Sequence, residues 1–134
     1  MQETNREYEK EEAMTPEEKC VDLEHAKPLV EAGIILETDY YFCRLNNKNN
    51  YTLEYKDYLV GEVVKELFAD IVPAPDSGEL LEWLREKLKY PIIQITHYGE
   101  SWDCFNRSPE ISFRNINLPN ALAELAVWVV KKGL

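Results

Sequence analysis

The sequence lacks the features that place a chain in a membrane or outside the cell. No apolar run in its 134 residues approaches the roughly 18 residues that span a bilayer. The first residues do not combine a basic start with an apolar stretch, so a secretory signal is not expected. The cysteines, Cys20, Cys43 and Cys104, are odd in number and have no C-x-x-C spacing. This pattern is typical of reduced thiols and predicts a cytoplasmic protein without membrane attachment.

Glycine and histidine are also scarce, which disfavours two common kinds of site. The five glycines are dispersed and form neither G-x-x-x-x-G-K-[ST] nor G-x-G-x-x-G, the loops that bind nucleotide phosphates. His25 and His97 are the only histidines, whereas structural zinc uses four Cys and His ligands at short paired spacings. We therefore expect neither a cofactor nor a bound metal.

Positive charge is in short supply, and the acidic charge is unevenly distributed. The formal net charge is −10, and residues 1–18 supply half of it with seven acids and two bases. Because binding to phosphates needs a basic patch and none is visible, we expect no direct contact with nucleic acid. We interpret residues 1–14 as a flexible acidic tail and residues 15–134 as a single domain.

Capping patterns and alternating residues predict the elements of the first half. Thr15 and Asp22 each have the position of a helix N-cap, and Gly33 has that of a C-terminal cap. Pro28 lies within the second helical pattern, so we expect a kink or a late start there. The segments TDYYFCRL and YTLEY predict strands joined by the asparagine-rich loop 46–50. Apolar residues at helical spacing then favour a helix within residues 61–71.

The second half predicts two helices around a group of strands. Asp76 and Glu79 have capping-box spacing, and a leucine stripe follows: Leu80, Leu81, Leu84 and Leu88. Strands are predicted within IIQITHYGESWDCFNR and ISFRNIN, and the wide apolar face of residues 117–134 predicts a closing helix. The fold class that follows is α+β, an antiparallel sheet built from hairpins with amphipathic helices packed mainly on one face.

The turn in HYGESW decides whether His97 and Cys104 can act together. If Gly99 and Glu100 form a two-residue turn, His97 pairs with Trp102 and lies diagonally from Cys104, on one apolar face. A three-residue loop would instead place His97 and Cys104 on opposite faces. The first register is favoured because it separates an apolar face from a mostly polar one. A buried cysteine beside a packed histidine is usually inert, so we assign no catalytic residue and keep this pair as an alternative.

Four segments resemble, in the same order, a loose group of small uncharacterised proteins from bacteriophages, prophages and gut Bacteroidetes. They are KCVDLEHAKPLVEAGI, TDYYF, VPAPDSGELLEWLREKL and ALAELAVWVVKKGL, and the resemblance covers roughly residues 19–134. The chain departs from the group at Pro28 and around residues 61–70. The resemblance implies a mobile-element setting and a compact α+β fold. It carries no assigned activity and no catalytic motif.

Tyrosines provide the candidate binding surface. Tyr40, Tyr58 and Tyr98 are predicted to face a protein partner, since tyrosine is enriched at interface hot spots. An exposed strand edge would also permit a homodimer by sheet extension. The leading hypothesis is a small cytoplasmic accessory protein of phage or mobile-element origin that binds another protein. The alternatives are an enzyme that uses His97 and Cys104, and an acidic inhibitor that mimics nucleic acid.

Overall fold

Helices and antiparallel strands share the chain in the computed structural model, which describes residues 14–60, 66–88, 92–107 and 110–133. The N-terminal part holds α2 (Pro16–Lys19), α3 (Leu23–Glu31), β1 (Tyr40–Leu45), β2 (Tyr51–Tyr55) and the 3-10 helix η1 (Lys56–Leu59). The C-terminal part holds β3 (Phe68–Pro73), α5 (Ser77–Lys87), β4 (Ile93–Tyr98), β5 (Ser101–Arg107), β6 (Glu110–Asn115) and α6 (Leu118–Lys131). The predicted tail lies outside the described residues except for Met14.

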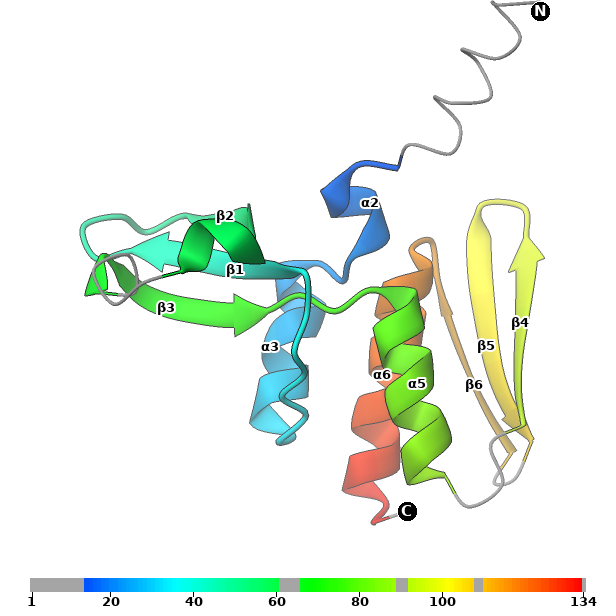
Figure 1. Ribbon diagram of the computed structural model, residues 1–134. Helices are drawn as coiled ribbons and strands as arrows, with labels where there is room; N and C mark the ends of the chain where they lie inside the picture. Colours follow the sequence, from blue (N-terminus) through cyan, green and yellow to red (C-terminus); the bar gives the residue numbers. More distant parts are fainter. Residues whose placement is uncertain (1–13, 61–65, 89–91, 108–109, 134) are drawn as a thin grey trace, which may run out of the picture.

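The strands form two three-stranded antiparallel sheets, ordered β2-β1-β3 and β4-β5-β6. Figure 1 shows the first sheet on one side of α3, α5 and α6 and the second sheet on the other side. The predicted α+β class is therefore confirmed, with its strands divided between two sheets. In the described part of the chain, no helix is both long and apolar enough to cross a membrane.

Strand β3 occupies part of the segment for which apolar spacing predicted a helix. Its Phe68 pairs with Leu45, and its Val72 pairs with Phe42 of β1. Val72 is buried while its neighbours are more exposed, which is the alternation of a strand that is covered on one face. The helix prediction is wrong for residues 68–71 because the ladder with β1 overrides a local helical pattern. Residues 61–65 lie outside the described residues.

One buried cluster joins residues from both ends of the chain. Helix α6 packs against α3 and α5 and also against β5 and β6. The predicted stripe of α5 is confirmed at Leu80 and Leu84, which are fully buried, and Leu122 and Leu125 of α6 are buried with them. Burying a leucine side chain contributes about 1.5–3 kcal/mol, so this cluster holds the helices against the second sheet.

The predicted caps of α3 are both present. The Asp22 carboxylate accepts from the His25 backbone N–H (2.9 Å). Gly33 has a φ of +82°, and the N–H of Ile34 reaches back to the Leu29 carbonyl (2.8 Å), which closes a Schellman motif. The helix runs from Leu23 through Pro28, so it starts at the predicted cap and not late. Pro28 has no N–H to donate to the carbonyl one turn earlier.

Candidate functional site

The predicted register of the β4–β5 hairpin is confirmed. Tyr98 pairs with Ser101, His97 with Trp102 and Ile95 with Cys104. Gly99 has a φ of +59°, which a two-residue hairpin turn requires at its first position. His97 and Cys104 are therefore diagonal neighbours on the face of the sheet that α6 covers.

Cys104 and His97 differ sharply in exposure although they share this face. Cys104 is fully buried. Burial, with the charges of Asp103 and Glu124, raises the pKa of its thiol to about 12, so it remains protonated at neutral pH. His97 was expected to face inward, but it is exposed on edge strand β4 and stacks on Trp102 with 4.2 Å between ring centroids. Nothing in this arrangement activates the thiol as a nucleophile.

The tyrosines predicted as a partner surface lie on different sheets. Tyr40 is half-buried in β1, and its ring lies 5.4 Å from that of Tyr55. Tyr58 is 72% exposed and contacts Tyr55 edge-on, with 6.4 Å between centroids. Tyr98 belongs to the second sheet, where the Arg114 guanidinium lies 5.2 Å from its ring. The structure therefore brings Tyr40 and Tyr58 into one cluster and places Tyr98 elsewhere.

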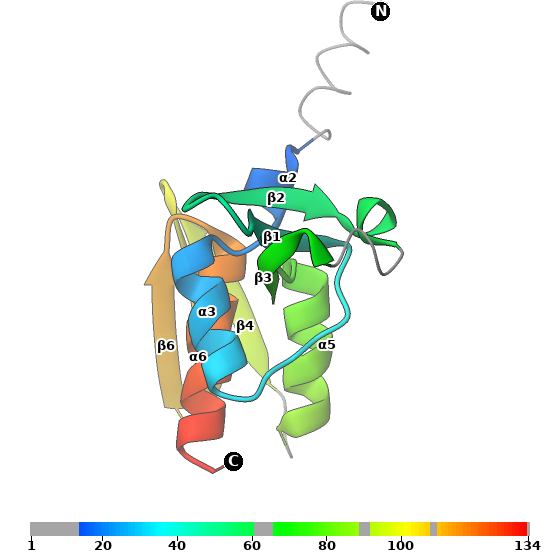
Figure 2. The ribbon, with the colours of Figure 1, turned by 90° about the vertical axis from the view of Figure 1, so that its left-hand side faces the viewer.

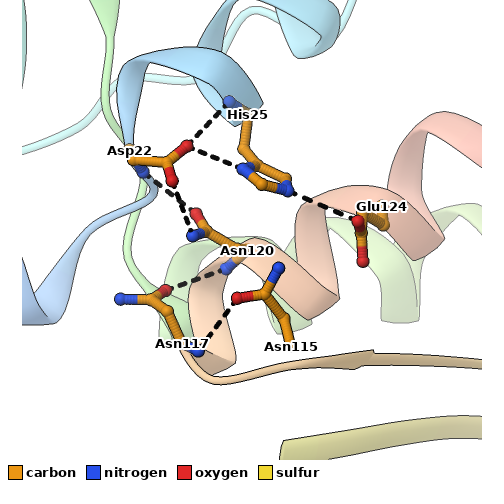
Figure 3. Close-up of polar contacts among 6 residues, drawn as sticks. All are labelled: Asp22, His25, Asn115, Asn117, Asn120 and Glu124. Atoms are coloured by element: carbon orange, nitrogen blue, oxygen red, sulfur yellow. Dashed lines mark hydrogen bonds and ion pairs between the residues drawn. The ribbon is translucent and has the colours of Figure 1, made fainter.

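A polar network that sequence reasoning missed joins the beginnings of α3 and α6 (Figure 3). The Asn120 side chain, on a residue only 5% exposed, bonds Asp22 twice. Its Oδ1 accepts from the Asp22 backbone N–H (2.9 Å), and its Nδ2 donates to the Asp22 carboxylate (3.0 Å). Asn117 caps α6 by accepting from the Asn120 N–H (3.0 Å). Asp22 thus caps α3 while it holds α6 in place.

His25 extends this network between two carboxylates. Its Nδ1 lies 2.6 Å from Asp22 Oδ1, and its Nε2 lies 3.4 Å from Glu124 Oε1. Burial lowers the pKa of His25, but hydrogen bonds and charge interactions with Asp22 and Glu124 outweigh burial and raise it above its ordinary 6.5. No group of three or more residues that could hold a metal ion is found among the described Asp, Glu, His and Cys side chains.

A groove of about 370 Å³ opens beside His25, between α3, α6 and β6. Figure 2 shows α3 and α6 side by side with β6 next to them. Phe113 and Trp128 give the groove an aromatic lining, and Glu124 contributes a carboxylate near one end. Lys131 lies two helical turns beyond Glu124 and also lines the groove. The groove therefore combines an apolar surface with polar groups toward its ends.

Strand β4 presents a second candidate surface, because it is one of the two edge strands of the second sheet in the described part of the chain. The Arg107 N–H donates to the Ile92 carbonyl (3.2 Å). Because hydrogen-bonded and non-hydrogen-bonded pairs alternate in an antiparallel ladder, Ile93, Ile95 and His97 direct their N–H and C=O groups away from β5. Ile92 is 52% exposed and Ile95 is 36% exposed along this edge.

The sequence contains weak signals for the parts of these sites that were missed. Asp22 was recognised as a cap, and the i, i+3 spacing to His25 permits their contact. The partners Asn120 and Glu124 are separated from Asp22 and His25 by 98 and 99 positions, so only the fold brings them together. The sequence shows that the segment IQITHY carries no Asp, Glu, Lys or Arg, but it does not show that this segment forms the edge of a sheet.

Comparisons with protein-family models, with curated proteins and with solved structures found no match for this chain.

Proposed function

We propose that this chain is an accessory protein that binds another protein by adding a strand of the partner to β4. The observation that carries the proposal is the composition of this edge. Between Ile93 and Tyr98 it has no Asp, Glu, Lys, Arg or Pro, although 30% of the chain is charged. Exposed strand edges attract further strands unless charge or proline blocks them.

The other three sheet edges carry such blocking residues. Strand β2 contains Glu54, β3 contains Asp70 and Pro73, and β6 contains Glu110 and Arg114. A partner strand placed against any of these edges would meet a charged side chain or lose a hydrogen bond. Strand β4 offers its outward N–H and C=O groups without either obstacle.

Exposed apolar side chains beside the edge add to the contact that a partner would make. Ile95 is exposed on the helix-covered face, Ile92 is exposed just before the strand begins, and Tyr98 is 54% exposed at the hairpin end. Backbone hydrogen bonds supply affinity in strand addition, and side-chain contacts on either face supply specificity. Of the three predicted tyrosines, Tyr98 is the one placed to contribute to this surface.

The proposed setting is the cytoplasm of a cell that carries a phage or another mobile element. The resemblance of residues 19–134 to phage- and prophage-encoded proteins supports the mobile-element origin. Cys20, Cys43 and Cys104 are free and buried, which fits a reducing compartment.

Site-specific photocrosslinking in cells tests the proposal. A photoreactive amino acid at Ile95 should form adducts with a bound partner, whereas the same residue at Ser112, on the opposite edge of this sheet, should not. An adduct of twice the 15.7 kDa chain mass would identify the partner strand as that of a second copy. Equal adducts at both positions, or adducts at Ser112 alone, would contradict binding at β4.

A matched pair of lysine variants tests the same edge by blocking it. Ile95→Lys places a charge on β4, and Ser112→Lys places one on β6. We expect Ile95→Lys to abolish the complex with the crosslinked partner and Ser112→Lys to leave that complex intact. Both variants should retain the circular dichroism spectrum of the native fold. Retained binding in folded Ile95→Lys would show that the partner docks elsewhere.

A further inference from the structure

The groove between α3, α6 and β6 has the features of a binding site for a small organic cation. We propose that it binds a compound with an apolar body and one ammonium or guanidinium group. The body would lie on Phe113 and Trp128, and the cationic group would contact Glu124. This site is independent of the proposed strand addition, because the groove adjoins β6, at the opposite edge of the sheet from β4.

The volume and the lining of the groove set the size of the ligand. At about 370 Å³ it is at the small end of the range for ligand pockets, which run from about 300 to 1,000 Å³. Pro28 and Val127 extend its apolar lining beyond the two aromatic rings. Small-molecule sites typically combine such a surface with a few polar groups that orient the ligand.

Glu124 has hydrogen-bonding capacity to spare. Within the described part of the chain, His25 is its only hydrogen-bonding partner, and the 3.4 Å between His25 Nε2 and Glu124 Oε1 exceeds the usual range for N–H···O bonds. A carboxylate can accept about four hydrogen bonds. The Glu124 side chain is 35% exposed, so a cation in the groove can reach it.

Aromatic and acidic groups together favour a cation over a neutral ligand. Among the described residues, no cationic side chain lies over the Trp128 ring; such contacts involve Tyr51, Trp83 and Tyr98 instead. The face of an aromatic ring attracts cations, and this attraction is strongest for the ring of tryptophan. Glu24, one residue before His25, also lines the groove and adds a second carboxylate to the one that His25 contacts.

Lys131 limits the position and the charge of the ligand. It lines the groove seven residues after Glu124, which corresponds to about 10 Å along the axis of α6. A compound with cationic groups at both ends would place one of them near this ammonium. The proposed ligand therefore has a single cationic group, directed toward Glu124.

Three probes with the same phenylethyl body but different charge test the proposal: phenethylammonium, neutral 2-phenylethanol and anionic 3-phenylpropionate. Nuclear magnetic resonance titration would follow the indole N–H signals of the three tryptophans. We expect phenethylammonium to shift the Trp128 signal with a dissociation constant on the order of 1 mM, a value typical of such small ligands. The neutral and anionic probes should bind at least tenfold more weakly. Equal binding of all three, or shifts confined to Trp83 or Trp102, would overturn the proposal.

A pair of isosteric variants separates the Glu124 carboxylate from general charge effects. Glu124→Gln should weaken phenethylammonium binding about tenfold and leave 2-phenylethanol unchanged. Glu86→Gln, on α5 and outside the groove, removes the same charge and should change neither affinity. Retained cation binding by a folded Glu124→Gln variant, or the same loss in Glu86→Gln, would show that this carboxylate does not hold the cation.

Discussion

At the scale of single residues, the thiols show how burial decides chemistry. Cys20, Cys43 and Cys104 are each at most 1% exposed. Burial, with nearby carboxylates, raises the pKa of the Cys20 and Cys104 thiols to about 12 and that of Cys43 to about 11. Only the thiolate reacts readily with alkylating agents, so both access and ionisation oppose reaction in the folded protein.

We therefore predict that iodoacetamide at pH 7 leaves all three cysteines of the native protein unmodified over minutes. In denaturant the same reagent should modify all three, as counted by mass spectrometry of the intact chain. Rapid modification of Cys104 in the native protein would contradict its burial and would favour the alternative in which His97 and Cys104 form an enzyme site.

His25 makes stability depend on pH, and the sign follows from its partners. Asp22 and Glu124 favour the charged imidazolium, so the pKa of His25 is higher in the folded than in the unfolded protein. Its stabilising contribution is fully present below the ordinary value of 6.5 and is lost as pH rises through the folded-state pKa. Glu79 acts in the same direction, because burial raises the pKa of its carboxyl to about 7.

Comparison of the native protein with the His25→Gln variant isolates the contribution of His25 to stability, because the contribution of Glu79 is the same in both proteins. The free energy of unfolding of the native protein should exceed that of the variant most at pH 5–6, by about 1 kcal/mol. The difference should shrink as pH rises past 7. Urea denaturation between pH 5 and pH 8.5 measures it, and a difference that grows with pH would show that the partners of His25 do not favour its charged form.

At the scale of elements, Asn120 is the principal polar link between α3 and α6. Asn120→Ala would leave the Asp22 N–H without its acceptor in a nearly buried position, and it would remove a donor from the Asp22 carboxylate. We predict a loss of about 2 kcal/mol in the free energy of unfolding. Asn117→Ser, which retains a capping oxygen at the start of α6, should cost far less. If Asn120→Ala lowers the free energy of unfolding by less than about 0.5 kcal/mol, the link is not stabilising.

Local chemistry made several elements predictable from the sequence. The caps at Thr15, Asp22 and Asp76 were correct because capping depends on residues only three positions apart. The hairpin at Gly99 was correct to the residue because turn type and side-chain alternation gave one consistent register. Strand β3 was missed because its pairing with β1 across more than twenty residues outweighs its local pattern.

The candidate sites were less predictable because they depend on contacts between distant segments. The groove is formed by residues 24–28, 113 and 123–131, which no short pattern links. His97 was placed on the correct face, but its exposure depends on how far the helices cover β4. Tyr98 was correctly assigned to a polar face, whereas its separation from Tyr40 and Tyr58 follows from the division into two sheets.

At the scale of the whole molecule, one buried cluster connects the two sheets. It includes Val72 of β3 and Cys104 of β5, together with residues of α3, α5 and α6. Phe42 and Leu53, in the middle of the first sheet, pack against the same cluster. Because neither sheet has a separate large core among the described residues, loss of one should expose the apolar surface of the other.

This arrangement predicts a single cooperative unfolding transition. The aromatic residues test it, because tryptophans and tyrosines report on different parts of the molecule. The tryptophans, Trp83, Trp102 and Trp128, lie on α5, β5 and α6, whereas five tyrosines lie between residues 40 and 58. Tryptophan fluorescence therefore reports on the second sheet and its helices, and tyrosine absorbance is weighted toward the first sheet. The two transitions in urea should coincide within error, as two-state unfolding requires.

A variant in the shared core extends the test. Leu84→Ala removes a fully buried side chain from α5 and should lower the free energy of unfolding by about 2–5 kcal/mol. If the two sheets unfold together, both signals should move to lower urea by the same amount, although the mutation lies outside the first sheet. A tyrosine transition that stays in place while the tryptophan transition moves would show instead that the first sheet is an independent unit. Strand addition at β4 would then concern the second sheet and its helices alone.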